Sequence, residues 1–213
     1  MTLKDYFLNN DGRNMIHKPM SYFDIYERYF SRFRGEKITV LEIGVENGGS
    51  LQMWKEYFGD KANIVGIDIN PKCKEFESKG ISVYIGDQAN RDFLYDVALK
   101  EGGFDIVIDD GGHHSKQQYL SFSHLYQVTR GIYLVEDIGC SYRPEYGGGY
   151  LHPASFIEFS KSKIDELMAH SNQLQATYFT DNTAAIHFHD CIIVFEKGKR
   201  QDHNTQAIGE RKI

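Results

Sequence analysis

The segment of residues 39–50, TVLEIGVENGGS, constrains the fold of this chain more strongly than any other stretch. Its first part, VLEIGV, is the short apolar run expected of a strand that is buried on both faces. Gly44, Gly48 and Gly49 then allow the backbone to turn sharply and to approach a ligand closely, and LQMWKEYF continues with helical spacing. A buried strand, a glycine turn and a helix in this order open the doubly wound α/β sheets that bind nucleotides at the carboxyl ends of their strands.

Further apolar runs predict the rest of this sheet. Residues 63–69 (NIVGIDI), 81–85 (ISVYI), 104–108 (FDIVI) and 131–135 (GIYLV) are typical of buried parallel strands. Later in the chain, AAIHF and CIIVFEK flank His189 and Asp190, which predicts a tight β-hairpin. The expected fold class is α/β, with a doubly wound, Rossmann-like, mostly parallel sheet of seven strands that includes a C-terminal antiparallel hairpin.

The chain divides by composition into three parts. Residues 36–197 hold the predicted sheet, and residues 198–213 form a polar tail. Residues 1–35 include YFDIYERYFSRF, in which aromatic and apolar residues recur at helical spacing. This N-terminal helix is either a cover that fills the core or a lid that brings His17, Lys18 or Tyr22 to the site, and both interpretations remain open.

Charge and hydropathy exclude several classes of partner. A formal net charge of -6 without clustered Lys and Arg argues against a general nucleic-acid surface. No apolar run approaches the roughly 20 residues of a membrane span, and the first residues lack the apolar region of a signal peptide. The cysteines are scattered and lack metal-ligand spacing, so a reducing, cytoplasmic location is expected.

Acidic residues follow two successive predicted strands, as Asp109-Asp110 and Glu136-Asp137. Neighbouring strands lie about 4.8 Å apart, so these side chains are expected to meet at one edge of the sheet. Converging carboxylates repel one another unless protons or a cation neutralise them, and Mg²⁺ prefers oxygen ligands of this kind. The alternative is that one acid of each pair caps the next segment and points to water.

Other polar residues at strand ends suggest further roles. His113 follows Asp110 by three positions on the same turn, and an imidazole there could serve as a general base, with His114 as its rival. Asp68 ends the second predicted strand, where such folds place a ribose-binding carboxylate; the alternative is an acid that points to solvent. Asp87 and Gln88 follow the third predicted strand and would face the adenine side of the same crevice.

Together, LEIGVENGGSLQMW, GIDI, GDQ, IDDGGHH, LVEDIG and CIIVFEK resemble a class I S-adenosylmethionine-dependent methyltransferase. More narrowly, they resemble the metal-dependent sugar O-methyltransferases of macrolide tailoring, over residues 39–197. The resemblance implies S-adenosylmethionine and Mg²⁺ as cofactors, Asp110, Glu136 and Asp137 as metal ligands, and His113 as the catalytic base. It also implies the cofactor contacts Glu42, Gly44, Gly48, Gly49, Ser50, Asp68, Asp87, Gln88 and Asp109.

The resemblance also assigns the acceptor side and shows two departures. SYRPEYGGGY resembles the family's substrate loop, so Tyr142 and Arg143, together with His114, are candidate acceptor contacts. Gly112 stands where the family turn commonly has Ser, which affects how His113 is placed. The chain also lacks the long N-terminal extension of some relatives and has fewer acceptor walls of its own, which is compatible with a homo-oligomer.

The sequence thus predicts an S-adenosylmethionine- and Mg²⁺-dependent O-methyltransferase that acts on a sugar carried by a nucleotide, a glycan or a natural product. The alternatives are methylation of a catechol-like diol and a non-catalytic cofactor-binding protein. A nicotinamide dehydrogenase is disfavoured because GVENGGS lacks the GxGxxG order and because paired acids have no role in hydride transfer.

Overall fold

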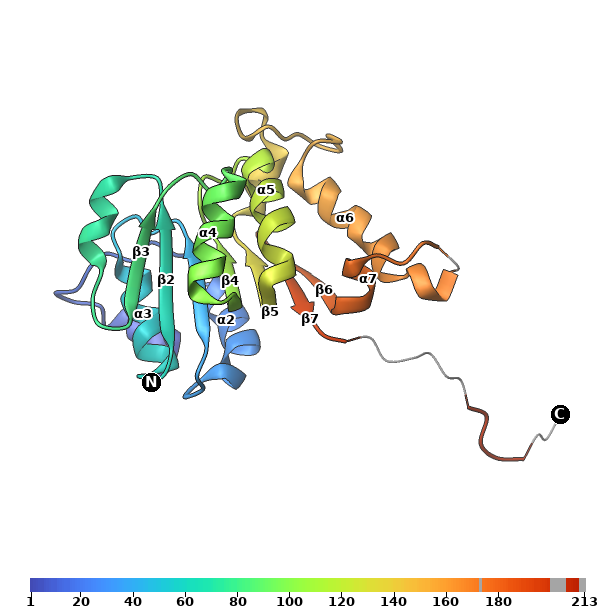
Figure 1. Ribbon diagram of the computed structural model, residues 1–213, viewed down its shortest axis with the longest axis horizontal. Coiled ribbons are helices and arrows are strands. Elements are labelled where there is room, and N and C mark those ends of the chain that lie inside the picture. The colour runs from blue at the N-terminus through green and yellow to red at the C-terminus, as the bar shows by residue number, and fades with distance from the viewer. Residues whose placement is uncertain (173, 200–205, 211–213) are drawn as a thin grey trace.

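The computed structural model describes residues 1–172, 174–199 and 206–210. Its centre is a seven-stranded sheet with the strand order β3-β2-β1-β4-β5-β7-β6 (Figure 1). Of the predicted polar tail, residues 200–205 and 211–213 lie outside the described residues. The strands are β1 Thr39–Ile43, β2 Asn63–Asp68, β3 Ile81–Ile85, β4 Phe104–Asp109, β5 Thr129–Val135, β6 Thr183–His189 and β7 Ile192–Lys197.

The sheet is parallel except at β7, which runs antiparallel to both β5 and β6. This matches the predicted mostly parallel sheet with a terminal hairpin. The hairpin turn lies one residue later than predicted, at Asp190 and Cys191, because His189 still pairs with Ile192. The hydroxyl of Tyr29 lies 2.9 Å from His189 Nε2 and helps to hold that strand end, and Cys191 takes the left-handed conformation (φ 61°) that closes the turn.

Helices cover both faces of the sheet (Figure 1). One hydrophobic cluster joins the strands to the N-terminal helices and α3, and a second joins the opposite face to the later helices. None of the helices in the described residues is long and apolar enough to cross a membrane. The first group is α1 Leu3–Leu8, α2 Tyr22–Phe30 and α3 Gly49–Phe58, and the second is α4 Arg91–Glu101, α5 Ser115–Leu125, α6 Phe156–Leu167 and α7 Tyr178–Asn182.

The apolar residues of α2 fill the core, while two of its hydroxyl groups reach the strand ends. The Tyr26 ring packs edge-on against Trp54 of α3, with centroids 5.1 Å apart, and stacks on Phe30. The hydroxyls of Tyr22 and Tyr26 nevertheless donate to acids that follow β5. The helix is therefore a packing element whose Tyr22 and Tyr26 hydroxyls also contact Asp137 and Glu136.

Candidate active site

The carboxyl ends of β1, β4 and β5 come together at one edge of the sheet. Ile43 pairs with Asp109, and Asp109 pairs with Val135, so the residues that follow these strands lie side by side. Gly44 has φ 93°, and a Cβ there would lie 2.1 Å from the carbonyl oxygen of Asp110. Only glycine can occupy this position without displacing the turn that carries Asp110.

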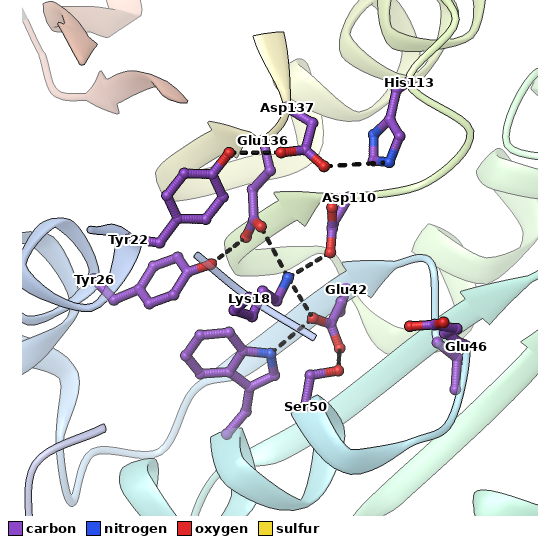
Figure 2. A network of polar contacts seen from close by, with 12 residues as sticks. Lys18, Tyr22, Tyr26, Glu42, Glu46, Ser50, Asp110, His113, Glu136 and Asp137 are labelled. Atoms are coloured by element: carbon purple, nitrogen blue, oxygen red, sulfur yellow. Dashed lines mark hydrogen bonds and ion pairs between the residues drawn. The ribbon is translucent and has the colours of Figure 1, made fainter. Parts of the chain in front are cut away.

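A buried lysine lies among the acids at this edge (Figure 2). Lys18 Nζ lies 2.5 Å from Asp110 Oδ2, 2.9 Å from Glu136 Oε2 and 3.6 Å from Glu42 Oε1. Burial alone would lower the pKa of Lys18, but the surrounding carboxylates raise it well above its usual range, so the ammonium group stays charged. The sequence left Lys18 as one of several lid candidates, and the structure places it at the centre of the site.

Glu42 and Glu136 lie on the buried side of this lysine. Glu42 accepts hydrogen bonds from Ser50 Oγ at 2.6 Å and from Trp54 Nε1 at 3.1 Å, and Glu136 accepts one from the Tyr26 hydroxyl at 2.7 Å. Burial raises the pKa of both carboxyls, and the adjacent Asp110 raises that of Glu136 further. These acids are therefore held in place by donors from α2, α3 and the N-terminal segment.

Asp137 and His113 lie on the more open side. Asp137 Oδ1 accepts from the Tyr22 hydroxyl at 2.6 Å, and Asp137 Oδ2 lies 3.4 Å from His113 Nε2. Both residues have positive φ angles, 52° and 55°, and the buried Nδ1 of His113 has no hydrogen-bond partner among the described residues. One ligand atom from each of Asp110, His113 and Asp137 lies within 4.8 Å of the others, a spacing that suits a metal ion.

A cavity of about 640 Å³ opens beside these groups, within the usual size range of small-molecule sites. Residues 14–18 form the N-terminal strap, of which Met15, Ile16, His17 and Lys18 line one side of the cavity. The sequence left His17 and Lys18 of this segment as lid candidates, whereas Met15 and Ile16 were not expected at the site. The predicted cofactor residues on the walls are Gly44, Ser50, Asp68, Asp87 and Gln88, and the catalytic and metal candidates there are Asp110, His113 and Asp137.

The remaining predicted cofactor residues stand behind the cavity wall. Glu42 and Asp109 are fully buried. A Cβ on Gly48 would meet the Phe76 ring at 2.4 Å, and a Cβ on Gly49 would meet the carbonyl oxygen of Met15 at the same distance. In this structure the group that approaches the backbone of Gly49 closely is the N-terminal strap and not a ligand.

Asp68 organises the glycine turn. Its Oδ2 accepts from the backbone N–H groups of Val45 at 2.8 Å and Glu46 at 3.1 Å, and its Oδ1 accepts from Asn70 N at 2.8 Å. Its predicted role on a ribose stays a prediction, because these contacts already give the side chain a structural function. Glu46 also lines the cavity and is exposed, and it was not among the site residues expected from the sequence.

Gln88 and Asp109 form a buried pair behind the turn that carries His113. Gln88 Nε2 donates to Asp109 Oδ1 at 3.1 Å, and Gln88 Oε1 accepts from Gly112 N at 2.8 Å. The hydroxyl of Tyr133 lies 3.3 Å from Asp109 Oδ2. The pair thus ties the end of β4 to the turn after β3 and fixes the backbone just before His113.

Burial raises the pKa of Asp109 to about 7, although Gln88 and Tyr133 donate to it. An Asp in an unfolded chain has a pKa of about 3.9, so between about pH 4 and about pH 7 the folded chain carries a proton on Asp109 that the unfolded chain has lost. Stability should therefore fall as pH rises through this window, by about 1.4 kcal/mol per pH unit from this group. We expect Asp109→Asn to reduce the change in the free energy of unfolding across this pH range, measured by urea unfolding of the metal-free chain.

Asp105→Asn is a matched control on the same strand. Burial raises the pKa of Asp105, but hydrogen bonds from Arg130 and Thr39 more than offset this and lower it overall. Asp105 therefore changes the free energy of unfolding only at pH values below its usual pKa. The control should leave the slope of the free energy of unfolding between about pH 4 and about pH 7 unchanged. An Asp109→Asn slope equal to that of the unmodified chain would contradict the prediction.

The predicted acceptor residues His114, Tyr142 and Arg143 are not among the residues that line the cavity. His114 Nδ1 accepts from Lys116 N at 3.2 Å at the start of α5, and its ring lies where a Cβ on Gly147 would be. Tyr142 and Arg143 are exposed in the loop that follows β5. His114 thus lies close to Gly147, in the same loop as the other two residues.

Comparison with known proteins finds similar methyltransferases, although no protein-family model matches the chain. An 8-demethyl-8-(2-methoxy-alpha-L-rhamnosyl)-tetracenomycin-C 3'-O-methyltransferase from Streptomyces olivaceus is 33% identical over 207 residues, which is 89% of this chain and 52% of the relative. The mycinamicin VI 2''-O-methyltransferase of Micromonospora griseorubida is 34% identical over 195 residues, covering 83% of this chain and 48% of the relative.

A solved structure of MycE methyltransferase from the mycinamycin biosynthetic pathway, in complex with Mg, SAH and mycinamycin VI, superimposes with a TM-score of 0.83 at 30% identity. The superposition covers 92% of this chain and 53% of the MycE chain. The chain therefore spans about half the length of the relatives that it matches.

Proposed function

Because the chain has the class I methyltransferase fold and its homologues are bacterial sugar O-methyltransferases, we propose that it transfers a methyl group from S-adenosylmethionine to a sugar hydroxyl with the help of a divalent cation. The observation that carries this proposal is the meeting of Asp110, His113 and Asp137 on the wall of the cavity beside the glycine turn. The acceptor is a sugar-bearing small molecule in this proposal.

The residues present suit a hard divalent ion such as Mg²⁺. Asp110 and Asp137 offer carboxylate oxygens, and the His113 ring lies within the same 4.8 Å cluster. A divalent cation here would lower the pKa of a sugar hydroxyl, as metals do for bound water. Glu136 is also proposed for this set from the family resemblance, but its oxygens accept hydrogen bonds from Lys18 and Tyr26 in this structure.

The cavity provides the binding site for the methyl donor in this proposal. Gly44 and Ser50 would lie against its amino-acid end, and Asp68, Asp87 and Gln88 would face its ribose and adenine. The N-terminal strap lines one side of the cavity, and in this proposal it would limit the access of water there. Orientation and exclusion of water are what a protein adds to a reactive cofactor.

His113 is proposed as the group that accepts the proton of the sugar hydroxyl. Its ring lines the cavity, and Asp137 lies 3.4 Å from Nε2, so the carboxylate can stabilise the imidazolium that forms. The acceptor sugar would enter from the side of His114, Tyr142 and Arg143, because the loop that carries the last two contacts His114.

The function is tested by incubating the chain with S-adenosylmethionine and a panel of nucleotide-linked sugars, glycosylated natural products and a catechol. We expect a singly methylated sugar by mass spectrometry, lost on addition of a chelator and restored by Mg²⁺. S-adenosylhomocysteine, but not NAD, should raise the melting temperature. Product that forms only from the catechol, or equally well with chelator, would contradict the proposal.

A further inference from the structure

The two nitrogens of the His113 ring have different surroundings. Nε2 lies 3.4 Å from Asp137 Oδ2 at the cavity wall (Figure 2), whereas Nδ1 is buried and has no hydrogen-bond partner among the described residues. A neutral imidazole carries its proton on one nitrogen, and the other nitrogen is an acceptor. The ring can therefore take a proton from a ligand in the cavity only if Nε2 is unprotonated and Nδ1 carries the hydrogen.

An N–H group at the buried Nδ1 needs an acceptor, since an unpaired polar group is costly to bury. Within the part of the chain that the structure describes, the buried side-chain oxygens without a partner include those of Ser115 and Gln118. Both residues lie at the start of α5, whose N-cap is His114. His113 is thus the residue before the cap and Gln118 is the fourth residue of the helix, and side chains at these two positions commonly pack against each other.

The segment that follows β5 contacts both of these side chains. Gln118 Nε2 donates to the backbone carbonyl oxygen of Glu136 at 3.3 Å, and the next residue, Asp137, lies beside His113 Nε2. Gln118 is 1% exposed, so its amide is shielded from bulk water. His113 and Gln118 therefore lie against adjacent residues of one backbone segment.

The contact with Glu136 fixes the orientation of the Gln118 amide. A backbone carbonyl oxygen only accepts hydrogen bonds, so the NH₂ group must face it and Oε1 must face away from it. Oε1 is in turn only an acceptor, so it can pair with an Nδ1–H group but not with an unprotonated Nδ1. The Ser115 hydroxyl can donate or accept, so it suits either state of Nδ1 and selects neither.

We propose that Gln118 is a positioning residue of the active site, whose Oε1 accepts a hydrogen bond from the Nδ1–H group of His113 and thereby keeps Nε2 unprotonated toward the cavity. This inference rests on the proposed function, in which His113 accepts the proton of the sugar hydroxyl. That proton then goes to Nε2 while Nδ1 keeps its own, and the imidazolium lies between Gln118 and Asp137. Hydrogen bonds of this kind are often long or poorly aligned in empty sites and tighten when ligands bind.

Removal of the acceptor should change the tautomer of His113. In Gln118→Met, which keeps a similar length but has no amide, an Nδ1–H group would be buried without a strong acceptor. The proton should therefore move to Nε2, where Asp137 Oδ2 can accept it. The ring then has no acceptor nitrogen at the cavity wall, so we expect kcat to fall about 10- to 100-fold with little change in KM.

The tautomer is measured by long-range ¹H–¹⁵N correlation NMR on the full chain with ¹⁵N-labelled histidine. Mg²⁺ and S-adenosylhomocysteine are present, at a pH at which histidine is neutral. The His113 signals are identified as those that His113→Ala lacks. We expect a protonated Nδ1 and an unprotonated Nε2 in the wild type, and the reverse in Gln118→Met. Gln52→Met, the same exchange at a half-buried position of α3, and Ser115→Ala are the controls and should keep the wild-type signals.

Two spectra would overturn the inference. One is a Gln118→Met spectrum in which Nδ1 of His113 stays protonated. The other is a Ser115→Ala spectrum in which the proton moves to Nε2, because the serine hydroxyl would then be the acceptor that selects the tautomer.

Gln118 also contacts the segment that carries Glu136 and Asp137, so cation binding is measured separately. The measurement is a titration with Mn²⁺, in which free Mn²⁺ is followed by electron paramagnetic resonance with S-adenosylhomocysteine present. We expect the same Mn²⁺ affinity in Gln118→Met as in the wild type. A loss of Mn²⁺ affinity without a change of tautomer would mean that Gln118 supports the metal ligands and not the base, and would overturn the inference.

The wild-type spectrum decides the question if Gln118→Met does not fold. A protonated Nδ1 whose hydrogen shows a nuclear Overhauser contact with the Gln118 side chain supports the inference. An unprotonated Nδ1, or an Nδ1–H group without that contact, overturns it.

These spectra do not depend on methyl transfer. If the tautomers are as expected but the wild-type chain methylates no sugar acceptor, the proposed function fails, and the role of Gln118 in holding the His113 proton stands. If the chain methylates a sugar but Nδ1 stays protonated in Gln118→Met, the inference fails and the proposed function stands.

Discussion

Replacing His113 by alanine should lower the rate of methyl transfer by about 10²- to 10⁴-fold, which is the usual contribution of a positioned general base. The affinity for S-adenosylhomocysteine should stay nearly unchanged, because the cavity wall around the donor is formed by many other residues. The measurement is turnover on a sugar acceptor that the wild-type chain methylates, together with calorimetric titration of S-adenosylhomocysteine. His170→Ala is the control, since His170 pairs with Asp181 and is not among the residues that line the cavity.

Two outcomes would assign His113 differently. Full activity in His113→Ala would move the base to another residue. Recovery of activity at high Mg²⁺ alone would identify the imidazole as a metal ligand, which its place in the Asp110 and Asp137 cluster permits. Recovery on addition of free imidazole, at unchanged Mn²⁺ affinity, is the result expected of a base.

The strands and the cluster of Asp110, His113 and Asp137 could be predicted, because the sequence patterns that indicate them are local. Each apolar run gives one strand, and the turn IDDGGHH carries both Asp110 and His113 within a few residues of the end of β4. The relation between β4 and β5 follows from the general arrangement of doubly wound sheets. Glu136 and Asp137 could therefore be placed beside Asp110 without knowledge of any long-range contact.

The burial of Lys18 among the acids could not be predicted, since it depends on contacts between distant residues. Lys18 and Asp110 are 92 positions apart, and nothing in NMIHKPMS marks the lysine as buried. Gly49 shows the same limit. The sequence indicates that some group approaches its backbone closely, and only the structure shows that this group is the N-terminal strap. Glu42 likewise lies in an apolar strand, and its partners Ser50 and Trp54 become apparent only once α3 is packed.

The second large effect is expected from Asp137→Asn. The substitution keeps the shape of the side chain but removes the negative charge of the most exposed acid in the cluster. Mn²⁺ affinity should fall by at least about 100-fold, the upper range seen when mere supporting groups of metal ligands are removed. Methyl transfer should be lost at ordinary Mg²⁺ concentrations and partly regained in excess Mg²⁺. Asp190→Asn, on the exposed hairpin turn, should change neither quantity.

Tyr22→Phe is a milder test of the role of Asp137 in cation binding. The Tyr22 hydroxyl donates to Asp137 Oδ1 at 2.6 Å, so its loss frees the carboxylate without removing it. We expect a smaller decrease in Mn²⁺ affinity, about 10-fold, because the ligand keeps its charge but loses its orientation. If Asp137→Asn bound Mn²⁺ as tightly as the unmodified chain, the ion would have to lie on the buried side of Lys18, beside Glu136. In that case Lys18 would have to leave the position that it occupies between Glu136 and Asp110.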